Sequence, residues 1–335
     1  MFALRGIAVA LSVFVIVYGI LSLAVGLCWR WSDVWRRGQR HTVRRSAELL
    51  FAWRMFPLVT AVVVTAAFAV PSFLLLEPRS IDEPLGGIPL ALGICAVGLG
   101  IFGVGNAGFA MRRVSRAVQK WTSAAQPIES CAPVPVLRIS SGVPPSGTIL
   151  SAFTVPAMAV AGIVRPKVLL SQAAEVVLTA GELQTALNHE VAHVRRRDNL
   201  KKLMLRCVAF PGMAGLEAAW LEATEMAADD AAVSNASEAL DLASALVKLS
   251  RLQPVEWGTV ESAIDMTAAL VHGSAAVVSA RVERLIAWSG ERLASPKTFF
   301  PWYGLGAAAA TVAVFAVAYS HLLAQVHTAT EWLVR

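Results

Sequence analysis

The sequence predicts an α-helical integral membrane protein with four transmembrane helices and a mainly α, α+β domain between the third and the fourth. Three observations lead to this fold class: an apolar composition, four long apolar stretches, and basic residues that border those stretches. Of the 335 residues, 56% are hydrophobic and 16% are charged, and the mean hydropathy is +0.60. Soluble domains average about 45–50% apolar and about 25% charged residues. The surplus of apolar residues therefore belongs in lipid.

Each of the four apolar stretches is long enough for a membrane-spanning helix. They run over Gly6–Cys28, Met55–Leu76, Gly86–Met111 and Phe299–Leu323. A helix needs about 20 residues to cross the hydrocarbon core, and these runs lack the alternation of a β-barrel strand. The first stretch is too long for the apolar region of a signal peptide and shows no small-residue cleavage site, so we interpret it as a retained span.

The charged residues between the spans predict the orientation of the chain. Basic residues gather between spans one and two and again after span three; they are Arg30, Arg36, Arg37, Arg40, Arg44, Arg45 and Arg54, then Arg112, Arg113, Arg116 and Lys120. The loop between spans two and three instead carries Glu77, Asp82 and Glu83 against Arg79. Positive charge stays on the cytoplasmic side of a membrane. We therefore expect a multi-pass protein of the cytoplasmic membrane with both termini outside, and no direct nucleic-acid binding.

This topology predicts three parts: a membrane region over residues 1–120, a cytoplasmic domain over 121–298, and a fourth span with a short external tail over 299–335. In the domain, strands are expected over 134–139, 149–160 and 164–170, before the pattern becomes helical after Ser171. Helices are expected over 179–197, 213–233, 235–252 and 281–288, with capping-box signatures at Thr179 and Asn235. The stretch 253–278 has weak periodicity and stays open.

The helix that begins at Thr179 carries the sequence His189-Glu190-Val191-Ala192-His193. Two histidines four residues apart lie on one face of a helix, so both imidazoles can reach one metal ion. A catalytic Zn²⁺ takes three protein ligands and keeps one position for water. Glu190 lies about 100° further round the helix, where it can accept a proton from that water without occupying the metal. The pattern predicts one Zn²⁺ ion held by His189 and His193, with Glu190 as the general base.

The third ligand has to come from elsewhere in the chain, and the acid-rich helix 221–230 is the first choice. Glu225 and Asp229 lie one turn apart, so Glu225 can bind the metal while Asp229 orients a ligating histidine. Glu222 lies three residues before Glu225, and spacing alone does not choose between them. His272 is a further alternative for the ligand. The apolar residues around these acids indicate burial, and a buried acid needs a partner.

These motifs resemble the membrane-bound zinc peptidases of peptidase family M56, the BlaR1/MecR1-like antibiotic sensors, and more distantly the Ste24/HtpX group. The family's H-E-x-x-H-x-x-x-x-D pattern falls on His189, Glu190, His193 and Asp198, and its E-x-x-x-D pattern on Glu225 and Asp229. The resemblance implies a zincin-like, gluzincin-type domain and an apolar edge strand, 166–170, that receives the substrate backbone. Ser171 stands where the family usually has proline. No S-x-x-K site with a following domain occurs, so β-lactam sensing is not implied.

Other residues of the domain have less specific roles. Asp198 is either an outer-sphere partner of the metal site or a salt-bridge partner of the basic run 195–197. His272 is a candidate oxyanion donor, because the domain contains no tyrosine between Trp121 and Lys297. Arg281, Arg284 and Arg292 are expected to anchor the domain to anionic lipid or to acids rather than to act in catalysis.

The sequence therefore predicts a membrane-anchored zinc metalloendopeptidase that cleaves a cytoplasmic or membrane-proximal protein. The resemblance implies a transcriptional repressor as the substrate in a signalling pathway. Two alternatives stay open: a protease for membrane-protein quality control, and a non-catalytic zinc-binding membrane sensor or scaffold. The expected partners are the protein substrate and the lipid bilayer, and the sequence leaves the cleavage site, the activating signal, self-cleavage and the oligomeric state undetermined.

Overall fold

The protein is mostly helical, with one small sheet, in a computed structural model of the whole chain. The structure describes residues 2–31, 43–78, 86–123, 125–128, 133–139, 156–208, 210, 212–252, 268–269, 275–288, 319 and 321–331. Three long helices occupy the N-terminal part, and the strands and shorter helices follow from residue 126 onward.

In the part of the chain that the structure describes, three helices are long and apolar enough to cross a membrane, and they cover the first three predicted spans except Gly86, which lies just before the third helix. Their bounds are Phe2–Trp31 for α1, Ser46–Leu76 for the apolar part of the second, and Gly87–Thr122 for α4. The second helix consists of α2 (Val43–Val64), a π-helical turn η3 (Thr65–Ala69) and α3 (Val70–Leu76). The helices are longer than the predicted spans because the helical backbone continues into the polar residues that flank each apolar stretch. The protein thus has helices of the kind that span a membrane.

Most of the predicted fourth span, 299–323, lies outside the described residues. Tyr319 and residues 321–331 are helical, and we call 321–331 the C-terminal helix. The Tyr319 hydroxyl donates a hydrogen bond of 2.6 Å to the carbonyl of Ala67, in the π-helical turn. The C-terminal helix therefore begins beside the second long helix.

The sheet has five strands in the order β1-β2-β4-β3-β5. The strands are β1 (Gln126–Ile128), β2 (Val136–Ile139), β3 (Met158–Ala161), β4 (Lys167–Ser171) and β5 (Ala268–Ala269). β4 pairs in parallel with β2 and antiparallel with β3. The expectation that the apolar strand 166–170 is an edge strand is therefore wrong, because β2 and β3 pair with both edges of β4. The side chains of β4 after Lys167 are buried as well, Val168 and Leu170 in one apolar cluster and Leu169 in another.

The helices of the domain are α5 (Gln172–Val177), α6 (Ala180–Arg196), α7 (Asp198–Cys207), α8 (Ala214–Ala232), α9 (Ala236–Arg251) and α11 (Ala275–Ile286). The helices α6, α8 and α9 begin one residue after their predicted starts, whereas α11 begins six residues before the predicted start at Arg281. Thr179 and Glu182 form the predicted capping box of α6. Asn235 caps α9 by accepting a hydrogen bond from the Glu238 amide. A cluster of buried Val, Leu and Ala side chains from β3, β4, α6, α9 and α11 forms the core that holds α6 in place.

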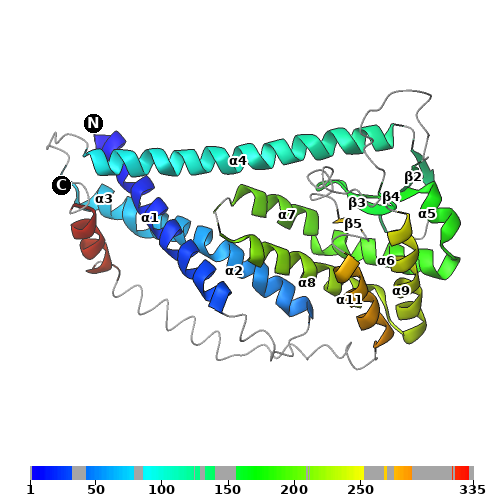
Figure 1. Cartoon of the computed structure of the whole chain (residues 1–335). Coiled ribbons are helices and arrows are strands. Elements are labelled where there is room, and N and C mark those ends of the chain that lie inside the picture. The colour runs from blue at the N-terminus through cyan, green and yellow to red at the C-terminus, as the bar shows by residue number, and fades with distance from the viewer. Residues whose placement is uncertain are drawn as a thin grey trace.

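The short helices do not all lie at one end of the molecule. Figure 1 shows α5, α6, α9 and α11 gathered with the strands, whereas α7 and α8 run back between α4 and α2. A turn at Gly212, whose φ of 93° suits glycine, separates α7 from α8. These two helices therefore connect the domain with the membrane region.

Candidate metal centre

The helix α6 brings His189, Glu190 and His193 into the interior of the domain. Its first turn is secured by the capping box, in which the Thr179 amide donates to the Glu182 carboxylate at 2.8 Å. Beyond that turn, the apolar residues of one face pack into the core, and the three residues of the motif are at least 98% buried. Burial of three polar side chains together requires partners for them.

Glu225 of α8 meets the two histidines of α6. The two Nε2 atoms of His189 and His193 lie 3.1 Å apart, and the Glu225 carboxylate oxygens lie 3.5 Å from His189 Nε2 and 3.6 Å from His193 Nε2. Ligands of one tetrahedral zinc ion, at bond lengths of about 2.0–2.1 Å, are separated by about 3.3 Å. This buried His–His–Glu group can therefore hold a metal ion.

Each of the two histidines has an aspartate next to its other ring nitrogen, as a hydrogen bond at His193 and as a close ion-pair contact at His189. His189 Nδ1 lies 2.9 Å from Asp229 Oδ1, and His193 Nδ1 lies 2.8 Å from Asp198 Oδ2. An Nδ1–H donated to a carboxylate leaves the Nε2 lone pair for a metal. Both Nε2 atoms then point at one another, an arrangement that repels unless a proton or a cation lies between them. The donor set thus fits a cation.

Asp198 reaches His193 through a break between α6 and α7. Arg197 adopts the left-handed conformation, with φ of 56°, and its amide closes the last turn of α6. The chain then turns so that Asp198 faces back toward the helix it has just left. Asp198 Oδ1 also lies 3.7 Å from Arg196 Nε, so the outer-sphere contact and the salt bridge considered for this residue coexist.

Arg281 of α11 lies inside this site and binds acids, which were one of the two kinds of partner expected for it, rather than lipid. Its Nε and Nη2 donate to the two oxygens of Asp229 at 2.8 and 2.6 Å, and its Nη1 lies 3.2 Å from Glu225 Oε2. The side chain is completely buried. The sequence contained a signal for this burial, because Arg281 lies on the same helix face as Val278 and Leu285, which are both buried.

The other two arginines of that group differ from Arg281. Arg284 pairs with Asp230 and donates to the carbonyl of Met226 at 3.2 Å. It therefore binds an acid of α8, which was one of the two expected partners. Arg292 lies outside the described residues.

Glu190 has no hydrogen-bond partner for either carboxylate oxygen within the described part of the chain, although both oxygens are buried. Burial raises its pKa to about 7, against the opposing charges of the two histidines. A carboxyl group with that pKa exchanges a proton readily near neutral pH. Its free oxygens beside the His–His–Glu group suit proton transfer with a molecule bound there.

The electrostatics of the remaining groups reflect their charge partners. Burial lowers the pKa of His193, but the charge of Glu225 and the hydrogen bond with Asp198 outweigh it and raise that pKa to about 9. Burial raises the pKa of Glu225 and of Asp229, yet the neighbouring histidines and Arg281 hold both pKa values below the ordinary range. Both carboxylates are therefore anionic at neutral pH.

The structure separates the alternatives that the sequence left open for the third ligand. Glu222 is exposed and is not among the residues that converge on the histidines. His272, proposed as an alternative ligand and as an oxyanion donor, lies outside the described residues. Glu225 is thus the acid of α8 that faces both histidines.

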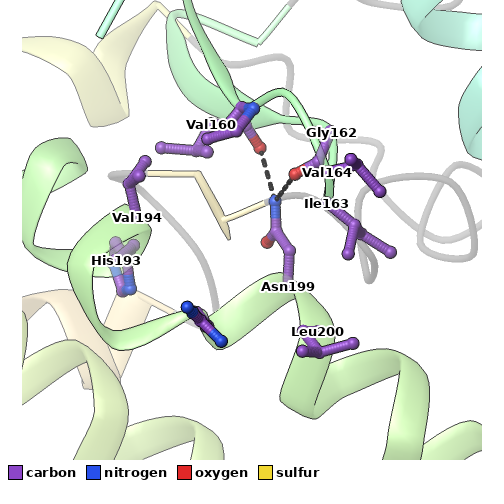
Figure 2. Close-up of a pocket in the computed structure, with 10 residues that line it drawn as sticks. Val160, Gly162, Ile163, Val164, His193, Val194, Asn199 and Leu200 are labelled. Carbon is purple, nitrogen blue, oxygen red and sulfur yellow. Dashed lines mark hydrogen bonds between the residues drawn. The ribbon is translucent and has the colours of Figure 1, made fainter.

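A cavity of about 460 Å³ borders the centre on the side of His193. It lies between the turn that joins β3 to β4 and the start of α7, and Figure 2 shows Asn199 bridging its two walls. The Asn199 amide donates to the carbonyls of Val160 and Gly162 at 3.2 and 3.1 Å. The cavity wall is therefore held at a fixed distance from α7.

No family model matches the chain, and no curated protein matches it.

Proposed function

We propose that the chain is a membrane-anchored zinc endopeptidase of the M56 type, in which His189, His193 and Glu225 hold one Zn²⁺. Imidazole and carboxylate are the ligands that catalytic zinc takes in peptidases. When bound, zinc lowers the pKa of a water ligand and polarises a substrate carbonyl. The observation that supports this proposal best is Glu190, a buried carboxylate with two unpaired oxygens beside the ligand group.

In this proposal Glu190 moves the proton of the reaction. It takes a proton from the attacking water and delivers it to the departing amine, which restores its carboxylate. A pKa of about 7 suits both halves of that exchange. Asp229 and Asp198 hold the two histidines in the tautomer that presents Nε2. A structural zinc site, as in a scaffold, would have no use for an unpaired buried acid next to its ligands, because such an acid costs stability.

The test is Glu190→Gln, with Glu222→Gln as the matched control on an exposed acid. Protein N-termini are compared by mass spectrometry between cells that carry each variant, and zinc is measured in the purified proteins. We expect Glu190→Gln to retain zinc and to lose cleavage by about 10²–10⁴-fold. Cleavage at the wild-type rate in Glu190→Gln would contradict the assignment. Cleaved repressors would favour signalling, and cleaved membrane proteins would favour quality control.

We further propose that the domain faces the cytoplasm, on the strength of the arginines that flank spans one and three. A reporter enzyme fused after Arg116 is expected to be active in the cytoplasm, and one fused after Arg335 is expected to be active outside. The reverse pattern would move the substrate class to the external side.

A further inference from the structure

The helices α7 (Asp198–Cys207) and α8 (Ala214–Ala232) run in opposite directions (Figure 1), and we call the two helices with Val208 and Phe210 between them the α7–α8 hairpin. The tip of this hairpin lies among the three candidate spans. Val208, at the tip, is buried in a cluster with Tyr18 of α1 and Ala61 of α2, and Leu99 of α4 packs against it. The ring of Phe210 meets that of Tyr18 at a centroid distance of 5.4 Å. Tyr18, Ala61 and Leu99 all belong to the apolar stretches, so the tip enters the membrane region.

Close backbone contacts hold the hairpin in that position. At Gly103 of α4 a Cβ atom would collide with the carbonyl of Cys207, so only glycine allows this approach. Arg54 of α2 is 98% buried, pairs with Glu217 of α8 at 2.8 Å, and donates to the carbonyl of Val208. The hairpin is therefore a built part of the membrane region.

The contacts along the hairpin show where it leaves the apolar layer. The ring of Trp220 on α8 lies 6.0 Å from that of Phe51 on α2, four residues before the second apolar stretch begins at Met55. Leu203 on α7 packs with Val114, three residues after the third stretch ends at Met111. Trp220 is therefore already outside the apolar layer, and the boundary of that layer crosses α8 near Glu217, which pairs with Arg54, one residue before Met55.

Glu225 follows Glu217 by eight residues of α8. At 1.5 Å per residue, the candidate metal centre lies about 12 Å beyond that boundary. Each polar headgroup layer is about 5–8 Å thick, the difference between a 40–45 Å bilayer and its 30 Å core shared over two sides. The centre therefore lies only about 4–7 Å outside the headgroups, with no room for a folded protein between it and the lipid.

The cavity beside His193 lies toward the same membrane surface. Its apolar lining includes Ile163 and Val164 from the β3–β4 turn and Leu200 of α7. Ile163 packs against Ala110 and Val114 at the end of the third span. Val164 next to it is 90% exposed. An apolar wall at this level suits an apolar side chain from a segment lying along the bilayer.

We propose that the centre cleaves juxtamembrane segments of membrane-anchored proteins, with an apolar side chain of the segment in the cavity beside His193. This inference rests on the peptidase function proposed above. A flexible segment that leaves the bilayer reaches a centre at this height within a few residues. A freely soluble protein reaches it only through a protruding disordered segment.

The first test locates the centre without using activity. A photoreactive benzoylphenylalanine replaces Val164 or, as a matched control, Val176 of α5, an exposed valine (79%) at the end of the domain away from the spans. The full chain is irradiated in vesicles of phosphatidylethanolamine and phosphatidylglycerol, and lipid adducts are measured by mass spectrometry. We expect adducts at position 164 and none at 176. Equal yields at the two positions overturn the proposed location.

The second test measures the substrate class. One disordered fluorogenic reporter with apolar residues at its centre is joined to a transmembrane helix by a Gly/Ser spacer of about 5 or about 40 residues. Both are reconstituted at equal density with wild type or Glu190→Gln. Because local concentration falls as about the −3/2 power of linker length, we expect the short spacer to be cut about 20-fold faster.

The outcomes of the second test separate the two proposals. Faster cleavage with the long spacer, or equal cleavage, overturns the juxtamembrane substrate and leaves the peptidase function intact. No cleavage of either reporter by wild type, with lipid adducts still present at position 164, overturns the peptidase function and the substrate class together, and leaves the location of the centre standing.

Discussion

Two groups of histidine and glutamate lie far apart in this molecule. Each has two residues four apart on one helix, but the two groups differ in their surroundings. His189 and His193 are four residues apart on α6 and meet Glu225 of α8; His327 and Glu331 are four residues apart on the C-terminal helix and meet Glu77 at the end of α3. Figure 1 places the C-terminal helix and α3 at the end of the molecule away from α6. Spacing alone would rank the two groups as equals.

The surroundings of the two groups differ in burial and in the partners of the histidine nitrogens. In the second group both nitrogens of His327 face glutamates of the group itself, at 3.9 Å from Glu77 and 3.4 Å from Glu331. Glu77 is also paired with Arg5 at 3.2 Å, and Glu331 is 43% exposed. In the first group each histidine keeps one nitrogen for an outer aspartate and one for the site. Burial and outer partners, rather than spacing, distinguish a metal centre.

The largest expected effect is a loss of zinc affinity when the third ligand of the first group is removed. Glu225→Ala removes one of three protein ligands, so zinc affinity should fall by more than the roughly 10–100-fold typical of outer-shell changes. Glu331→Ala, in the second group, should leave the zinc content at the wild-type value. Metal analysis of purified protein at limiting zinc measures both. Zinc loss in Glu331→Ala with retention in Glu225→Ala would place the ion at the other end of the molecule.

The next effect concerns the outer aspartates of the first group, which have no counterpart around the second group among the described residues. Asp229→Asn and Asp198→Asn should each weaken zinc binding by about 10–100-fold, because the histidines lose the acceptor that fixes their tautomer. Asp230→Asn is the control, since Asp230 pairs with Arg284 and not with a histidine. Competition with a chelating dye gives the three affinities. Equal zinc affinities for all three variants would show that Asp229 and Asp198 do not orient the histidines for metal binding.

A smaller effect is expected at Arg281, the buried cation behind the first group. Arg281→Lys keeps the charge but loses the two-pronged hydrogen bond to Asp229, so zinc affinity should fall by less than about 10-fold. Arg281→Met leaves Asp229 buried without its partner, which typically costs about 3–5 kcal/mol of stability. Thermal unfolding and zinc competition on the same samples separate the two effects. Unchanged stability of Arg281→Met would contradict this role.

The smallest effect lies at the start of α6, where no metal takes part. Burial raises the pKa of Glu182, but Lys248, Ser244 and the Thr179 amide outweigh it and lower that pKa to about 2. Since the folded pKa lies below the ordinary 4.5, this contribution to stability is present above pH 4.5 and is lost as the pH falls toward 2. Glu182→Gln should destabilise zinc-free protein by about 1 kcal/mol at pH 7, because Lys248 is partly exposed.

The measurement for Glu182→Gln is thermal unfolding in detergent across this pH range. The difference from wild type should shrink between pH 4.5 and 2. A difference that grows as the pH falls would contradict the assigned pKa direction.

Local patterns predicted the helices, the caps and the ligand face of α6, because each depends on residues within one or two turns. The apolar runs predicted four spans, of which the three that lie in the described residues are long apolar helices, and the capping signatures at Thr179 and Asn235 predicted where α6 and α9 begin. The i, i+4 spacing of His189 and His193 placed both on one face. In such cases the deciding interactions are close in sequence, so the chain can be interpreted without its fold.

Only the tertiary structure decided what depends on distant segments. It selected Glu225 over Glu222 because the rotation of α8 against α6 determines which acid faces the histidines. It buried Arg281 behind Asp229, 52 residues away in the sequence. It placed β4 between two strands, and it placed the α7–α8 hairpin among the spans. These outcomes follow from how helices and strands pack against one another, a property that no local pattern of residues contains.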